Sequence, residues 1–195
     1  PGIRISGRAY PDGSCLHPTD QLLCRATWAV AGDEHIQHRI IATQRVGGRQ
    51  TVGRAELAAL VWLTHCDGDF SVCTDCQYLA RRFARIRGSF VPPKWLEGIN
   101  GDLWMLVRRT DIEVSWIRSH MEREDVVRLG FQLCDWAGNA SADVAAGVLA
   151  VTLLPAQSTL DARECTFVAL QIVHLIFSGV EEAVLACHHA PTHPI

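Results

Sequence analysis

Four acidic residues of this sequence stand beside apolar or small residues, in segments that a soluble protein tends to bury. They are Asp12, Glu56, Asp75 and Asp143. If folding brings these side chains together, their negative charges repel one another and raise the pKa values of the carboxyl groups. Two divalent cations about 3.5–4 Å apart would remove that repulsion and create a site for phosphodiester hydrolysis. Oxygen ligands of this kind select Mg²⁺ or Mn²⁺ over zinc.

Each of the four acids also has an ordinary structural explanation. Asp12 stands in an Asp-Gly pair, which is common in turns. Asp75 follows an apolar run and precedes a helix-forming segment, so it could cap that helix. Glu56 and Asp143 could each interact with the positive end of a helix dipole. Against this, Glu56 is spaced i, i+4, i+7 with two leucines, which places its carboxylate on the helix face that packs on the sheet.

The segments that carry these acids follow an order typical of a mixed sheet. β-Prone residues predict strands over 3–15, 25–31, 36–43, 70–74 and 112–117. Helical periodicity and helix-forming residues predict helices over 54–66, 76–87, 100–109 and 138–150, the last with Asn139 as its N-cap. We therefore expect an α/β domain in which an antiparallel meander is followed by strands that alternate with helices.

A domain boundary is expected near Pro155, which interrupts the pattern. Residues 1–152 would form the catalytic domain, and residues 153–195 would form a C-terminal helical extension to which no function is assigned. The segment 166–180 is apolar for 15 residues, whereas a membrane span needs about 20 residues. We expect a buried or partner-facing helix there. Three histidines near the end could bind metal, but a mobile tail is the preferred interpretation: His188, His189 and His193.

The formal net charge of −3 does not exclude a nucleic-acid partner, because the acidity is unevenly distributed. Residues 151–195 hold one arginine and four acids, while basic and acidic residues balance in the rest of the chain. Carboxylates that bind cations would leave that remainder positively charged. Nearly all of the basic residues before residue 151 are arginines, which suit bidentate contacts with phosphate.

Eight cysteines are scattered through apolar segments rather than spaced as a disulfide framework, so we expect reduced thiols. The one close pair, Cys73 and Cys76, lacks a second pair at the spacing of a zinc site. No N-terminal segment resembles a signal peptide. We therefore expect an intracellular protein, in the cytoplasm or the nucleus. Because the chain begins at Pro1, we also expect it to be a fragment cut from a longer polyprotein.

Six short segments occur in the order known from type-1 ribonuclease H domains, and the chain resembles that family over roughly residues 5–150. These segments are YPDGSC at 10–15, RAELAAL at 54–60, TDCQYL at 74–79, NGDLW at 100–104, VSWIRSH at 114–120 and GNASAD at 138–143. The family comprises metal-dependent endonucleases that cut the RNA strand of an RNA–DNA hybrid. Any one segment is a weak motif, but six in order, with strands and helices in the right places, make a strong signal.

The resemblance implies the ribonuclease H fold, a five-stranded mixed sheet flanked by helices. It implies two Mg²⁺ or Mn²⁺ ions bound by four catalytic carboxylates: Asp12, Glu56, Asp75 and Asp143. One ion would activate water for in-line attack, and the other would stabilise the leaving 3′ oxygen. It also implies that His120 assists proton transfer or product departure, although alone it would be interpreted as a surface histidine. The family's retroelement members suggest an upstream reverse-transcriptase domain and no membrane partner.

Recognition of the hybrid would rest on its shape and its 2′-hydroxyl groups rather than on its base sequence. The family pattern suggests that Gln77 and Asn100 contact the two strands of the hybrid. Three arginines after Asp75 are candidates for contacts with the nucleic-acid backbone, or else form a solvated helix face: Arg81, Arg82 and Arg85. Trp104 is expected in the core.

Two features depart from the family pattern, and three other functions stay open. Pro11 stands where a central strand usually donates a backbone hydrogen bond. The stretch from His120 to Asp143 is longer than in compact bacterial members. The main alternative is a catalytically inactive hybrid-binding or structural module of a retroelement polyprotein. The others are another nuclease or integrase on the same fold, and a membrane-anchored or oligomerising protein led by the apolar tail.

Overall fold

The computed structural model describes residues 3–21, 23–34, 37–157, 159–171 and 173. The contacts within the chain divide it into two compact units, Pro1–Leu154 and Pro155–Ile195. All five strands, the six named helices and every described residue with a predicted chemical role belong to the first unit. Among the described residues, the chemistry predicted from the sequence is therefore confined to that unit.

A five-stranded mixed sheet forms the centre of the first unit, as the sequence predicts. Its strands lie in the order β3-β2-β1-β4-β5. The first three strands are antiparallel neighbours, and β4 runs parallel to both β1 and β5. The strands are β1 (Gly7–Leu16), β2 (Arg25–Glu34), β3 (Gln37–Arg45), β4 (Phe70–Thr74) and β5 (Val114–Trp116).

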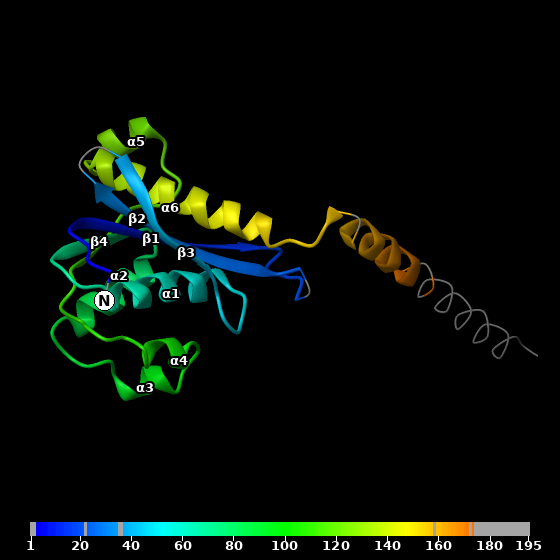
Figure 1. The fold of residues 1–195 in the computed structure, drawn as a ribbon, viewed down its shortest axis with the longest axis horizontal. Coiled ribbons are helices and arrows are strands. Elements are labelled where there is room, and N and C mark those ends of the chain that lie inside the picture. The colour runs from blue at the N-terminus through cyan, green and yellow to red at the C-terminus, as the bar shows by residue number, and fades with distance from the viewer. Residues whose placement is uncertain (1–2, 22, 35–36, 158, 172, 174–195) are drawn as a thin grey trace, which may run out of the picture. The chain divides into compact units, whose positions relative to one another are not determined.

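Helices cover both faces of this sheet, with α1 on one side and α6 on the other (Figure 1). A large apolar core lies between the sheet and α1, and includes Leu57, Leu60 and Phe83. A smaller core under α6 includes Tyr10 and Ile117. The helices are α1 (Val52–Thr64), α2 (Gln77–Ile86), α3 (Pro93–Leu96), α4 (Gly101–Trp104), α5 (Arg123–Arg128) and α6 (Leu133–Thr152).

Several predicted elements are shorter than the sequence suggested, among them β5, which spans only Val114–Trp116 of the predicted 112–117. The strand predicted over 3–15 begins only at Gly7, whose φ of 80° interrupts the extended chain, and Arg4 forms an isolated bridge with Asp67. The helix predicted over 100–109 ends at Trp104. After Trp104 the backbone bonds to a distant segment of the chain, since the amide of Arg108 donates to the Thr64 hydroxyl at 3.1 Å.

The prediction for the last helix of this unit is wrong at its start. Helix α6 begins at Leu133, five residues before the predicted start, and Asn139 lies inside it rather than at its N-cap. Glycine and asparagine are common at helix ends, which explains the error. Here Gly138 serves packing instead: a Cβ at this position would collide with the ring of Tyr10.

Pro11 does not interrupt the sheet. It pairs with Val30 inside a continuous β1–β2 ladder. The β1–β4 ladder has already ended at the pair Ala9 and Val72, two residues earlier. The departure from the family pattern is therefore accommodated beyond the last paired residues of these two parallel strands.

The described part of the second unit is helical at residues 157, 159–171 and 173. Apolar side chains such as Phe167 and Leu170 are exposed on this helix, which agrees with a C-terminal helical extension. Much of the predicted apolar segment 166–180, and all three C-terminal histidines, lie outside the described residues. Among the residues that the structure describes, no helix has the length and apolar character needed to cross a membrane.

Candidate metal-binding site

Asp12 lies near the middle of β1 and is only 4% exposed. Its Oδ1 accepts a hydrogen bond of 2.6 Å from the amide of Gly13. Gly13 lies against helix α1 so closely that a Cβ there would be 2.5 Å from the backbone nitrogen of Glu56. A residue without a side chain at this position lets the strand and the helix bring Asp12 and Glu56 together.

Glu56 projects from the second turn of α1, a helix that Thr51 caps by accepting a hydrogen bond from the amide of Arg54. Glu56 is 6% exposed, and its Oε2 is buried without a hydrogen-bond partner. This confirms that Glu56 lies on the packed face of the helix rather than in solvent. An unpartnered buried oxygen of this kind is costly unless a cation or a donor binds to it.

Asp75 follows β4, and its side chain is half-buried. The helix-capping explanation is not what the structure shows, because the N-cap of α2 is Cys76 and no side chain caps this helix. Instead, one carboxylate oxygen from each of Asp12, Glu56 and Asp75 lies within 4.8 Å of the other two. These acids come from β1, α1 and the end of β4, and they form one cluster.

A hollow beside this cluster brings in the remaining predicted residues. It is lined by Asp75, His120, Asn139 and Asp143, among others. Asp143 and Asn139 project from α6, one helical turn apart, and the Asn139 amide donates a hydrogen bond to the Asp75 carboxylate. His120 has a left-handed backbone, with φ of 48°, in the loop after β5. The structure therefore places all five residues predicted to be catalytic around one site.

Crowding and burial raise the pKa values of these acids. The pKa of Asp12 rises to about 8, because burial disfavours its charged form and because the charges of Asp75 and Asp143 add to that effect. Burial raises the pKa of Glu56 well above its usual range, and the charges of Asp12 and Asp75 act in the same direction. Burial also raises the pKa of Asp75, although the hydrogen bond from Asn139 and the nearby His120 oppose this.

The donor set fits hard divalent cations. It consists of carboxylate oxygens, one of them buried and unpartnered, and oxygen ligands suit Mg²⁺ and Mn²⁺. In the part of the chain that the structure describes, this cluster is the only group of three or more acids, histidines or cysteines close enough to share a metal ion. The two cysteines of the close pair have different neighbours: Cys73 lies by Arg8 and Asp135, whereas Cys76 lies by Glu56.

Helix α2 presents a basic surface that begins next to Asp75. Gln77, Arg81 and Arg85 are exposed and spaced four residues apart, and they line one groove together with Tyr78 and Arg82. Arg82 differs from the other two arginines. Its guanidinium lies 4.2 Å from the ring centre of Trp95 and 4.5 Å from that of Tyr78.

Asn100 lies near the start of α1 and is held there by Arg54. The Arg54 guanidinium donates to the Asn100 side-chain oxygen at 3.1 Å and forms an ion pair with Asp102. Its Nε also donates to the carbonyl of Gly47. Asn100 itself has a left-handed backbone, with φ of 65°. Trp104, which follows in the same motif, is buried in the core as predicted.

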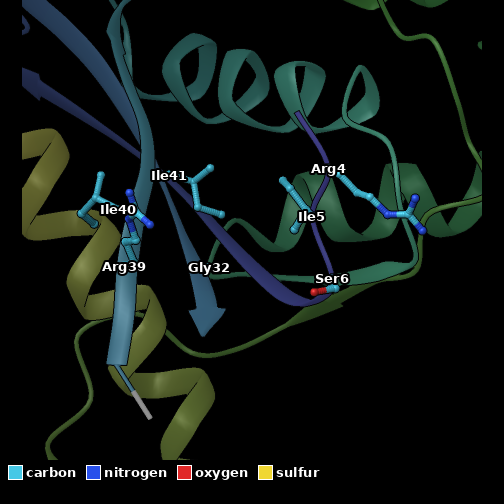
Figure 2. A pocket seen from close by; sticks show the side chains of 7 residues that line it. All are labelled: Arg4, Ile5, Ser6, Gly32, Arg39, Ile40 and Ile41. Carbon is cyan, nitrogen blue, oxygen red and sulfur yellow. The ribbon is translucent and has the colours of Figure 1, made fainter. Parts of the chain in front are cut away.

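Another pocket of the first unit lies between the segment before β1 and the strands β2 and β3 (Figure 2). Figure 2 shows Ile41 extending toward Ile5, whereas the side chain of Arg4 points away from them. Gly32 leaves room for Ile41 in this pocket. None of the seven lining residues is acidic, so the pocket offers no carboxylate ligands and is not part of the candidate metal site.

Sequence reasoning misses two kinds of residue at this site. The sequence predicts Asn139 to be a helix cap, although its side chain contacts Asp75. A second group links β1 to α6: Asp135 forms an ion pair with Arg8 and accepts a hydrogen bond from Tyr10. The alternation of Arg8, Tyr10 and Asp12 along one strand places them on the same face, and this was the available signal.

Comparisons with known proteins concern the family and the fold of this chain. A family model described as RNase H matches residues 6–150. The solution structure of the PFV RNase H domain is 18% identical with a TM-score of 0.50, covering 76% of this chain and 96% of that domain. The foamy viral protease–reverse transcriptase, solved in complex with dsDNA, is 16% identical with a TM-score of 0.45, covering 75% and 97% of the two chains.

LC9-RNase H1, a type 1 RNase H with the type 2 active-site motif, is 17% identical with a TM-score of 0.41 and covers 75% of each chain. No curated protein sequence matches the chain. The family model spans the whole of the sheet and the elements that carry all four predicted carboxylates. The chain therefore belongs to the RNase H family.

Proposed function

We propose that this chain is an endonuclease that hydrolyses the RNA strand of RNA–DNA hybrids with the help of two divalent metal ions. The observation that carries the proposal is the cluster of Asp12, Glu56 and Asp75, whose oxygens lie within 4.8 Å of one another in a member of the RNase H family. Three close carboxyl groups, two of them buried, are unfavourable without a cation. Bound divalent cations would remove this repulsion.

The metal-binding residues are Asp12, Glu56 and Asp75, with Asp143 completing the set from α6. Divalent ions held by these oxygens supply activated water and neutralise charge on the phosphate. The buried Oε2 of Glu56 has no hydrogen-bond partner, which suits a ligand atom. Asn139 donates to Asp75 and so fixes the orientation of that carboxylate, as outer hydrogen-bond partners do in metal sites. We expect Mg²⁺, with Mn²⁺ as a substitute.

His120 is proposed to handle protons at the rim of the site. It lies in the same hollow as Asp75 and Asp143, in a loop rather than in the sheet. A histidine there can give a proton to the departing 3′ oxygen. The carboxylates would hold the metal ions that position the scissile phosphate, and His120 would assist release of the product.

Hybrid binding is proposed along α2 and at the start of α1. Gln77 and Asn100 would contact the two strands of the hybrid, and the exposed Arg81 and Arg85 of α2 would contact phosphates. The nuclease would occupy residues 1–152, with 153–195 as a separate extension. The sequence resemblance to retroelement polyproteins further suggests an upstream reverse-transcriptase domain and an intracellular location.

The proposal is tested by cleavage of an end-labelled RNA–DNA hybrid, with double-stranded DNA as the comparison substrate. We expect cuts within the RNA strand in Mg²⁺ or Mn²⁺, little action on double-stranded DNA, and no cutting in EDTA. The variants Glu56→Gln and Asp75→Asn should lose activity by orders of magnitude, because a neutral amide cannot replace a charged metal ligand. Glu113→Gln is the matched control, since Glu113 is an exposed acid paired with Arg87.

Two results would reject the proposal. Activity that survives chelation would exclude the metal mechanism. Near-normal cleavage by Asp75→Asn would remove Asp75 from the ligand set and reopen the hypothesis of an inactive or differently acting module. Because Asp75 does not cap α2, its neutral variant should unfold at the same or a higher temperature in metal-free buffer, which separates loss of function from loss of fold.

A further inference from the structure

Helix α6 contacts the sheet through small residues, so bulky side chains do not fix its position along its own axis. Its buried face includes Gly138, Ala142, Ala146 and Ala150. Helices with large side chains are held in register by ridges that fit into grooves. A row of alanines allows close approach but forms only shallow ridges, so other contacts must set the register of α6.

Asp135 makes such contacts in the first turn of the helix. Its Oδ1 lies 2.8 Å from the Nε of Arg8 and accepts a hydrogen bond of 3.3 Å from the Tyr10 hydroxyl. The Asp135 side chain is 10% exposed and the Arg8 side chain is 32% exposed, so this ion pair is partly shielded from water. Arg8 is itself anchored, because its Nη2 donates to the Ser115 hydroxyl on β5 at 2.6 Å.

Tyr10 adds a steric contact to these polar ones. Its side chain is fully buried, and a Cβ on Gly138 would collide with its ring. The ring therefore fits under α6 only because residue 138 is glycine. Tyr10 precedes Asp12 by two residues and shares its face of β1, so the same strand that carries Asp12 also holds the helix that carries Asp143.

We propose that Asp135, acting through Arg8 and Tyr10, is a positioning residue. It sets the position of Asp143 relative to Asp12 along the axis of α6. Asp143 lies eight residues, or about two helical turns, after Asp135 on one continuous helix. A shift of the first turn would be transmitted along this helix toward Asp143, and the Thr27 hydroxyl holds the helix beyond it by donating to the Ala146 carbonyl at 2.7 Å. The inference rests on the proposed function, because the position of Asp143 along α6 affects activity only if the carboxylates bind metal together.

The test compares Mn²⁺ binding with folding. Asp135→Asn keeps the shape of the side chain and an acceptor for Tyr10 but removes the charge opposite Arg8. We expect Mn²⁺ affinity, measured by calorimetry without substrate, to fall about tenfold, as happens when an outer partner of a metal site is changed. With hybrid present, kcat should fall while KM stays level, because the nucleic-acid contacts on α2 are untouched.

A second variant moves the helix without changing charge. Gly138→Ala pushes a methyl group against Tyr10 and should lower Mn²⁺ affinity in the same way. Arg8→Lys retains the positive charge and should keep more affinity than Arg8→Met. Asp125→Asn is the matched control: it breaks an exposed ion pair with Arg128 on α5 and should leave Mn²⁺ affinity unchanged.

Each outcome decides the inference. Variants that unfold at lower temperature but bind Mn²⁺ as tightly as the unchanged chain would overturn it and leave Asp135 with a structural role only. If Asp135→Asn does not fold, equal affinity of Arg8→Lys and Arg8→Met would overturn it instead. An unchanged chain that binds Mn²⁺ yet cuts no hybrid would overturn the proposed function alone. Failure of that chain to bind Mn²⁺ would overturn both.

Discussion

Gly13 on β1 and Glu56 on α1 lie in backbone contact, and a Cβ at Gly13 would come within 2.5 Å of the Glu56 nitrogen. Gly13→Ala should therefore push the helix away from the strand. We expect a loss of about 1–3 kcal/mol in the free energy of unfolding, as in overpacked cores, together with weaker metal binding. Chemical denaturation and Mn²⁺ titration measure the two effects.

Gly53→Ala is the control for that change, since it adds a methyl group to the same helix where nothing lies within 4 Å. It should leave stability level or raise it by up to about 1 kcal/mol, because alanine favours helices. A Gly13→Ala variant that is as stable as the unchanged chain would contradict the close packing of the strand on the helix.

The metal-free protein should lose stability as the pH rises. The folded protein holds a proton on Asp12 up to about pH 8, whereas the unfolded chain releases it near pH 4. A group whose pKa is raised by folding stabilises the folded state at low pH, and that contribution disappears as the pH rises through the folded pKa. The loss should therefore fall between about pH 4 and pH 8.

Thermal unfolding in EDTA across this range measures the effect, and Asp12→Asn should flatten the dependence because asparagine does not titrate. Mg²⁺ should raise the unfolding temperature more at the upper end of the range, since metal binding must displace the bound protons. An equal slope in the unchanged and variant chains would contradict the assignment to Asp12.

On α2, substitutions of Arg81 and Arg85 should have different effects from a substitution of Arg82. Arg81 and Arg85 are exposed, so Arg81→Ala with Arg85→Ala should reduce the slope of hybrid affinity against salt by about one for each arginine that binds a phosphate. Arg82 lies over Trp95 and Tyr78, and Arg82→Ala should instead lower stability by about 1–2 kcal/mol. Filter binding at several salt concentrations and thermal unfolding distinguish the two cases. An unchanged slope in the double variant would assign Arg81 and Arg85 to a solvated helix face.

Residues 1–154 should fold and cut hybrid without the rest of the chain. Every element of the sheet lies in this unit, and Arg25 donates to the Leu153 carbonyl at 3.1 Å, which places its natural end after that residue. The shortened chain should have the same unfolding temperature and kcat as the full chain. An insoluble fragment would mean that the extension covers part of the core.

The sequence was most informative where the signal is local. Apolar runs and helical periodicity predicted the strand Phe70–Thr74 with both of its ends, and they predicted α1 and α2 to within two residues of their ends. The face of Glu56 followed from its spacing to two leucines. These properties depend on neighbours along the chain, so periodicity alone can report them.

The sequence was least informative where distant segments decide the structure. Gly138 and Asn139 are residue types common at helix ends, yet both lie inside α6. A side chain at residue 138 would collide with the ring of Tyr10, and the Asn139 amide interacts with the Asp75 carboxylate. Likewise, beyond the short helix after Asn100 the amide of Arg108 donates a hydrogen bond to the hydroxyl of Thr64, forty-four residues earlier in the chain. Such contacts are made by tertiary packing and leave no periodic pattern.

The end of the β1–β4 ladder also sets the relative positions of Asp12 and Asp75 in the acidic cluster. The last pair joins Ala9 to Val72, and Asp12 and Asp75 each stand three residues beyond it. Since the two strands run in the same direction, equal counts from a shared origin bring the two carboxylates level with each other. A single residue added or lost on only one side would turn one acid to the opposite face of the sheet. We therefore expect the chain to accept length changes between its elements, such as in the long stretch before α6, but not within these two short intervals.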